Sequence, residues 1–183
     1  MKFSKWILLS IIGMFIIMGC SLDESTGPEP EPEPEPLNIL CINEFLASND
    51  TANEDEFGGF DDWFELYNGT AAAIDIGGMY VTDDLTDLAK YQIPDTDPTL
   101  TTVQPGEFLL IWADSETEQG VLHVDFKLSS GGEDLAITDV DGVTIIDSYT
   151  FGGQTTDVSV GRLPDGTDSW STFDAPTPGT SNQ

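Results

Sequence analysis

Residues 62–69 read Asp62-Trp63-Phe64-Glu65-Leu66-Tyr67-Asn68-Gly69. This stretch places a short run rich in aromatic residues directly before an Asn-Gly pair, which is a strong turn signal. Because aromatic and β-branched residues favour pleated strands, we expect a strand over 62–68 that ends in a turn. Similar runs recur on both sides of it, so the surrounding domain is expected to consist of short strands.

These runs are separated by turn residues such as Gly77-Gly78, Pro105-Gly106 and Asp141-Gly142. No segment shows a convincing amphipathic helix of three turns. Short strands at even spacing, in a domain of this size, predict an all-β fold of the Greek-key β-sandwich type. We predict strands over 38–46, 62–68, 73–82, 88–93, 106–113, 121–127, 133–138, 143–150, 157–163 and 169–173.

The same segments, in the same order, resemble the lamin-tail domain family. Met79 stands where tryptophan is common in that family, and Phe64 stands where a β-branched residue is common. The resemblance implies an immunoglobulin-like β-sandwich that acts as a non-catalytic binding or structural module. It covers residues 38–182 and is carried by segments 42–45, 62–68, 76–84, 91–94, 105–113, 123–128, 132–135, 157–162 and 176–182.

The N-terminus has the features of an export signal over residues 1–19. Lys2 and Lys5 precede an apolar run over 6–18. At about 13 residues, that run is too short to span a membrane as a helix but is typical of a signal peptide. Residues 17–20 end in Gly19-Cys20 and resemble the lipobox of bacterial lipoproteins. That resemblance implies cleavage before Cys20 and a lipid on its thiol, so we predict an exported lipoprotein anchored to a membrane of the cell envelope.

Residues 20–36 are predicted to be a spacer between the lipid and a single folded domain over 37–183. Proline and glutamate alternate over 28–36, and such a sequence favours an extended, semi-rigid polyproline conformation with a rise of about 3.1 Å per residue. The preceding residues, Ser21-Leu22-Asp23-Glu24, resemble the acidic signal that directs some Bacteroidetes lipoproteins to the outer face of the outer membrane. The resemblance implies display on the cell surface.

Charge restricts the partners. Only Lys90, Lys127 and Arg162 remain basic after cleavage, against 34 acidic residues, which gives a net charge of about −31. Such a field repels phosphate groups, so we expect no binding to nucleic acid and no attraction to anionic lipid. The membrane contact is then expected to come from the lipid on Cys20. We expect a monomer whose partner is a protein or a polysaccharide.

The chain offers few residues for catalysis. Cys41 is the only cysteine besides Cys20, so the mature chain has no intramolecular disulfide, and its place in an apolar run predicts a buried structural thiol. His123 is the only histidine, which excludes multi-histidine metal sites and favours a structural role on a strand. No Gly-x-Ser-x-Gly, phosphate loop or Cys-x-x-Cys occurs. We therefore expect no enzyme. The alternative is an exported hydrolase with an unrecognised active site.

An acidic loop over 50–62 is the candidate metal site. Calcium binds six to eight oxygens from carboxylates, amide side chains and carbonyl groups. Such oxygens could converge if Gly58-Gly59 lets the loop fold back, although the spacing is not that of an EF-hand. The alternative is a solvated acidic loop. The predicted Ca²⁺ ligands are Asp50, Asn53, Asp55, Asp61 and Asp62.

Overall fold

The computed structural model describes residue 34 and residues 37–183. The predicted signal peptide over 1–19, the lipidation site Cys20 and nearly all of the predicted spacer lie outside the described residues. Within the described part, no helix is long and apolar enough to cross a membrane.

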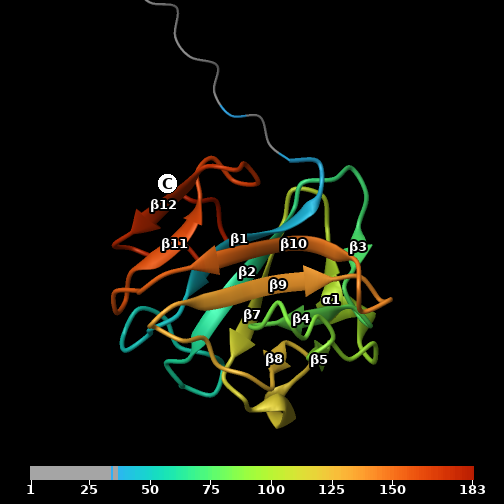
Figure 1. Cartoon of the computed structure of the whole chain (residues 1–183), viewed down its shortest axis with the longest axis horizontal. Helices are drawn as coiled ribbons and strands as arrows, with labels where there is room; N and C mark the ends of the chain where they lie inside the picture. Colours follow the sequence, from blue (N-terminus) through green and yellow to red (C-terminus); the bar gives the residue numbers. More distant parts are fainter. Residues whose placement is uncertain (1–33, 35–36) are drawn as a thin grey trace, which may run out of the picture. The chain divides into compact units, whose positions relative to one another are not determined.

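One layer of the domain is a six-stranded sheet in the order β12-β11-β1-β2-β7-β8 (Figure 1). Neighbouring strands are antiparallel, except that β7 and β8 are parallel. The strand β11 pairs with β1, so the sheet joins the two ends of the domain. The strands are β1 (Leu40–Leu46), β2 (Asp62–Asn68), β7 (Phe108–Ala113), β8 (His123–Val124), β11 (Ser159–Arg162) and β12 (Trp170–Phe173).

The second layer is a four-stranded sheet in the order β10-β9-β4-β5, whose strands β9 and β10 cross in front of β1 in Figure 1. A two-stranded sheet of β3 (Ile74–Asp75) and β6 (Thr102–Val103) accompanies it. The two helical turns are short: α1 (Pro98–Thr101) and η1 (Thr117–Gln119). The four strands of the second layer are β4 (Tyr80–Thr82), β5 (Tyr91–Gln92), β9 (Glu133–Thr138) and β10 (Ile145–Phe151).

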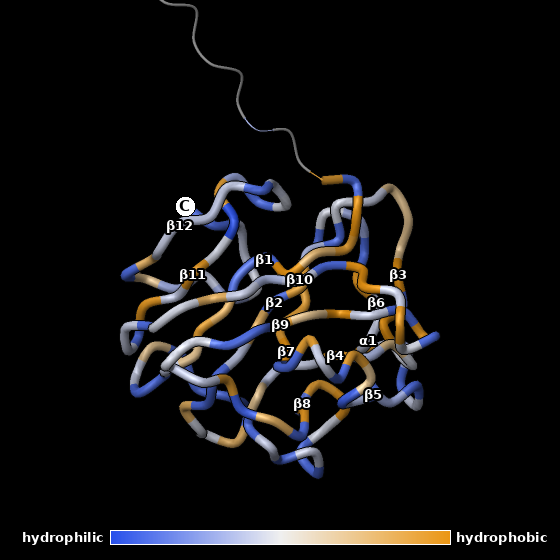
Figure 2. The backbone as a smooth tube through the Cα atoms, viewed as in Figure 1, coloured by the Kyte–Doolittle hydropathy of each residue, from blue (hydrophilic) through white to orange (hydrophobic). Residues whose placement is uncertain are grey.

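The apolar core lies between the two layers. Phe45 and Phe64 from the large sheet and Leu135 and Ile137 from β9 have no exposed surface and belong to one cluster. Figure 2 shows hydrophobic stretches along strands such as β1 and hydrophilic residues in the loops around them. Burial of this apolar surface is the main stabilising contribution, at roughly 25 cal/mol per Å².

The other face of the large sheet is also covered around β1, because all seven residues of β1 are buried. There Asn43 donates to Asp165, Glu44 accepts from Thr177, and Asn182 donates to the carbonyl group of Asn43. These partners come from residues 163–182, which we call the C-terminal segment. Cys41 lies in the same strand, buried and unpaired, as predicted. Burial raises the pKa of its thiol to about 12.

The predicted strands overlap strands of the structure, but those over 88–93 and 121–127 shorten to the two-residue strands β5 and β8. The strands β2 and β9 have the predicted limits, 62–68 and 133–138. The prediction of one strand over 73–82 is wrong, because a turn at Gly78, with φ of +85°, divides it into β3 and β4. The strand β6 was not predicted, because two residues held by pairing with β3 show no pattern of their own.

Candidate functional site

The loop between β1 and β2 is folded onto one end of the large sheet. Asn49, which is buried, donates to the carbonyl groups of Asn53 and Asp61 and accepts from the N–H of Ala52. The indole N–H of the buried Trp63 donates to Asn53 Oδ1 at 2.6 Å. These contacts hold the acidic loop, residues 50–62, firmly against the rest of the domain. Asn49 was missed by the sequence analysis, because an asparagine in a polar loop has no distinguishing signal.

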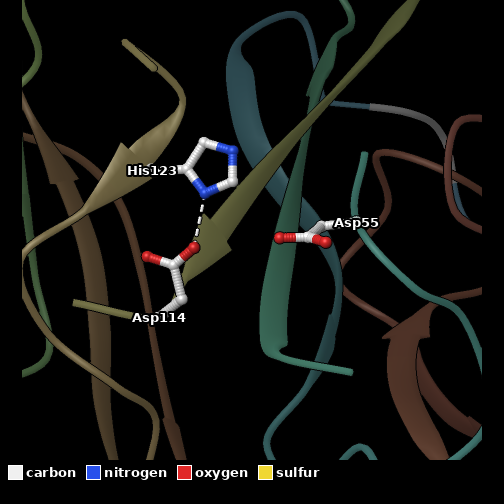
Figure 3. A group of neighbouring side chains, drawn as sticks. All are labelled: Asp55, Asp114 and His123. Atoms are coloured by element: carbon white, nitrogen blue, oxygen red, sulfur yellow. Dashed lines mark hydrogen bonds and ion pairs between the residues drawn. The ribbon is translucent and has the colours of Figure 1, made fainter. Parts of the chain in front are cut away.

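The acidic loop brings Asp55 to Asp114 and His123 (Figure 3). One ligand atom from each of these three buried side chains lies within 4.8 Å of the other two. Asp114 follows directly after β7, and His123 opens β8. We call these three residues the acid–histidine cluster. Among the described residues, it is the one group of three or more histidine, cysteine, aspartate or glutamate side chains that lie close enough together to hold a metal ion.

Both ring nitrogens of His123 face carboxylates. Nδ1 is hydrogen-bonded to Asp114 Oδ2, and Nε2 lies 3.5 Å from Oε1 of the exposed Glu56. The ring stacks against Trp112, with 6.5 Å between centroids, and meets the edge of Phe57 at 6.0 Å. The predicted position of His123 on a strand is confirmed, but its position in a carboxylate cluster was not foreseen.

The two oxygens of Asp55 differ. The N–H groups of Phe57 and Gly59 donate to Oδ1 at 2.9 and 2.7 Å, which forms a tight turn. Oδ2 is buried and has no hydrogen-bond partner. Figure 3 shows the carboxylate of Asp55 facing Asp114 and His123 from across the site. The unpartnered oxygen therefore belongs to one of the three side chains of the cluster.

The acidic loop folds back at Gly58, which was the condition for the calcium site, since the N–H of Asp55 donates to the carbonyl group of Gly59 at 2.8 Å. Of the five residues predicted to bind calcium, the structure brings only Asp55 into the cluster. Asn53 Oδ1 receives the indole N–H of Trp63. Asp61 Oδ1 lies 3.5 Å from Lys127 Nζ. Calcium binding by the five together stays a prediction.

The other two predicted ligands lie at the ends of the loop. Asp50 is exposed, and its backbone N–H donates to Asp157 Oδ1 at 2.7 Å. Asp62 is the first residue of β2. Burial raises the pKa of Asp62 to about 6, although hydrogen bonds from the backbone of Asn49 and the charge of Lys127 act in the opposite direction.

A groove of about 490 Å³ lies between the strands β10 and β12. Tyr149 and Trp170 stack in it, with 3.8 Å between ring centroids, and Phe45 packs against both. In a chain with 34 acidic residues, no carboxylate lines this groove. We call it the β10–β12 groove, and its lining is Tyr149, Thr150, Phe151, Gly152, Gln154, Val160, Trp170, Ser171 and Thr172.

Comparison with known families agrees with this architecture. The family model of the lamin tail domain matches residues 34–153. The chain belongs to the lamin tail domain family. The all-β fold and the immunoglobulin-like β-sandwich are thereby confirmed, and the lamin tail domain is a structural, immunoglobulin-like module. Neither a curated protein nor a solved structure matches the chain.

Proposed function

We propose that this lamin tail domain is carried on a lipid at the cell surface and binds an extended, uncharged segment of a partner protein in the β10–β12 groove. The observation that carries the proposal is the neutral groove in a strongly acidic chain. Carboxylates elsewhere repel acidic partners, whereas the groove offers aromatic rings, hydroxyl groups and an amide. Aromatic residues that present both apolar and polar surface are typical of binding sites.

The flanking strands favour a polypeptide over a polysaccharide. Within residues 37–183, β10 pairs only with β9, and β12 pairs only with β11. Each strand therefore presents its outer edge toward an added strand, and main-chain hydrogen bonding to such an edge is a common way to bind an extended peptide. Tyr149 and Trp170 would contact alternate side chains of that peptide.

The sequence supports the anchor and the display. The lipobox ending at Cys20 supplies the lipid, and the Pro-Glu repeat over 28–36 supplies a spacer of roughly 28 Å at about 3.1 Å per residue. A groove that recruits a partner protein needs such clearance from the membrane. The acidic signal over 21–24 supports the outer face of the outer membrane.

The anchor is tested in a lipoprotein-competent host. The wild-type protein should partition into detergent and carry a lipid mass on Cys20, and protease added to intact cells should degrade it. The Cys20→Ala variant should be soluble and lack the mass shift. Recovery of soluble, unlipidated wild-type protein, or full protection from protease in intact cells, would contradict the anchor or the display respectively.

The groove is tested by photo-crosslinking in intact cells. A photoreactive amino acid at Thr172, inside the groove, should give an adduct that protease removes, with the crosslink mapped to an uncharged partner segment. The matched position is the exposed Glu118 in η1, which should give none. Equal adducts at both positions, no adduct at Thr172, or an adduct that only periodate degrades would overturn the polypeptide-binding groove.

A further inference from the structure

We propose that Asp55, Asp114 and His123 bind a divalent transition metal ion such as Zn²⁺, which fastens the acidic loop to the ends of β7 and β8. The three ligands come from three separate segments of the chain. A shared ion would therefore join the acidic loop to the ends of β7 and β8, which already pair with each other.

The geometry is close to that of a metal site. The three donor atoms already lie within 4.8 Å of one another. Bonds from zinc to histidine nitrogen and to carboxylate oxygen are about 2.0–2.2 Å long. Asp55 would move inward, whereas His123 Nδ1 and Asp114 Oδ2, which are in direct hydrogen-bond contact, would move apart to admit the ion. The ion would replace the proton that joins His123 Nδ1 to Asp114 Oδ2. A fourth position stays open for water.

The unpartnered oxygen of Asp55 points to a ligand. Asp55 is only 6% exposed, and its Oδ2 has no hydrogen-bond donor. Buried carboxylate oxygens without a partner are rare because they lose their hydration and gain nothing in return. A cation at the cluster would supply the missing partner.

The charges of the cluster also favour a divalent cation. Two carboxylates and a neutral imidazole balance one divalent cation. The basic side chains of the domain are engaged elsewhere: Lys90 pairs with Asp83, Lys127 lies near Asp61, and Arg162 pairs with Asp147. Among the described residues, the ion pairs therefore bring no lysine or arginine to the cluster.

The environment of His123 suits a ligand. Metal-bound histidines commonly donate their second N–H to a carboxylate, which orients the ring. If Nδ1 binds the ion, Nε2 faces Glu56 Oε1 at 3.5 Å. Trp112, only 6% exposed, stacks on the ring and shields it from water.

The donor set favours zinc-like ions over calcium. Imidazole suits zinc, copper, nickel and iron, whereas calcium takes six to eight oxygen ligands. The cluster offers one nitrogen and two carboxylates. It therefore differs in ligands and in metal from the calcium site predicted for residues 50–62.

The test uses the full-length protein in detergent, stripped with a chelator and titrated with Zn²⁺ in a calorimeter. The wild type should bind one equivalent, and Asp55→Asn should weaken binding at least about tenfold. The matched control is Glu54→Gln, which removes a charge from an exposed neighbour and should leave the affinity unchanged. With Co²⁺, the visible absorption of a bound ion should appear in the wild type and be lost in Asp55→Asn.

Thermal unfolding separates a metal ligand from a merely structural residue. Zn²⁺ should raise the melting temperature of the wild type in proportion to the logarithm of its concentration, but not that of Asp55→Asn. His123→Gln serves as a second ligand variant should Asp55→Asn not fold. Absence of saturable Zn²⁺ binding, equal binding by the wild type and both ligand variants, or tighter binding of Ca²⁺ than of Zn²⁺ would overturn the proposal.

Discussion

The large sheet buries carboxylates at two places, and it treats them differently. Under the C-terminal segment, Glu44 accepts hydrogen bonds from Ser159 and from both the N–H and the hydroxyl group of Thr177. In the acid–histidine cluster, Asp55 Oδ2 has no donor at all. At the first place, hydroxyl and N–H donors reach Glu44, and the neighbouring Glu65 keeps one oxygen, Oε1, without a partner. At the second place, carboxylates gather around one imidazole.

The two places also differ in whether a buried carboxyl group keeps its proton. Glu65 pairs with Glu44 across β1 and β2. We call these two carboxylates and the donors of the C-terminal segment around them the polar layer. Burial raises the pKa of Glu65 to about 8, despite a hydrogen bond from the N–H of Gly179. A carboxyl group that keeps its proton near neutral pH needs no cation. The comparison teaches that one domain can bury acidic groups either with donors and protons or, as we propose, with a metal ion.

The largest effect is expected where the acidic loop is held to the sheet. Trp63→Ala should lower the free energy of unfolding by about 3–5 kcal/mol, because it empties a fully buried site, and the indole of Trp63 also anchors Asn53. Zn²⁺ binding should weaken in the same variant. Chemical denaturation measures the first effect and calorimetry the second.

Phe60→Ala is the control for Trp63, because Phe60 lies in the same loop and is 43% exposed. It should change stability by no more than about 0.5 kcal/mol. A cost below about 1 kcal/mol for Trp63→Ala would show that the loop is not held by this residue.

The polar layer is tested by Thr177→Val, which keeps the shape and removes the hydroxyl that donates to Glu44 Oε2 at 2.9 Å. Loss of one donor to a buried acceptor should cost about 1–3 kcal/mol in denaturant unfolding. Thr180→Val removes an exposed hydroxyl nearby and should cost no more than about 0.5 kcal/mol. Equal losses of stability in Thr177→Val and Thr180→Val would contradict a special role of the hydrogen bond from Thr177 to Glu44.

The protonation of Glu65 predicts a dependence on pH. The folded state keeps this proton up to a pKa of about 8, whereas the unfolded state releases it near the ordinary glutamate pKa of 4.5. The free energy of unfolding should therefore fall as the pH rises between these values, by at most about 1.4 kcal/mol per pH unit. Glu65→Gln should remove this contribution, so urea unfolding at pH 5, 6.5 and 8 should give a smaller slope than in the wild type. Parallel curves for the two proteins would contradict a protonated Glu65.

The smallest expected effect is the change in stability when the buried carboxylate at each of the two places is replaced by an amide. In the presence of a chelator, Asp55→Asn should stabilise the protein by up to about 1 kcal/mol, because a neutral amide replaces a buried carboxylate whose Oδ2 has no donor. Glu44→Gln should destabilise it, because its amide would face the N–H and hydroxyl donors of Thr177. Thermal unfolding of both variants measures the signs. The same sign for both would break the comparison.

The fold could be predicted from the sequence because its signals are local. The run Asp62–Asn68 has the limits of β2, and Cys41 is buried on a strand as expected. Strands of two residues, such as β6, have no signal because pairing creates them. The candidate site could be predicted only in part: the acidic loop and Asp55 were identified, but Asp114 was not, since a single aspartate after a strand resembles many others.

The sequence by itself determined the class of the folded domain, an acidic all-β domain of the lamin tail family. From the sequence we also predict an export signal with a lipobox and a Pro-Glu spacer. Each of these depends on composition or on neighbours along the chain. Only the tertiary structure decided which side chains meet. Asp55 and His123 are 68 positions apart in the chain, and Glu44 meets Thr177 across 133 positions. Such contacts are set by sheet order and loop packing, and no local pattern records them.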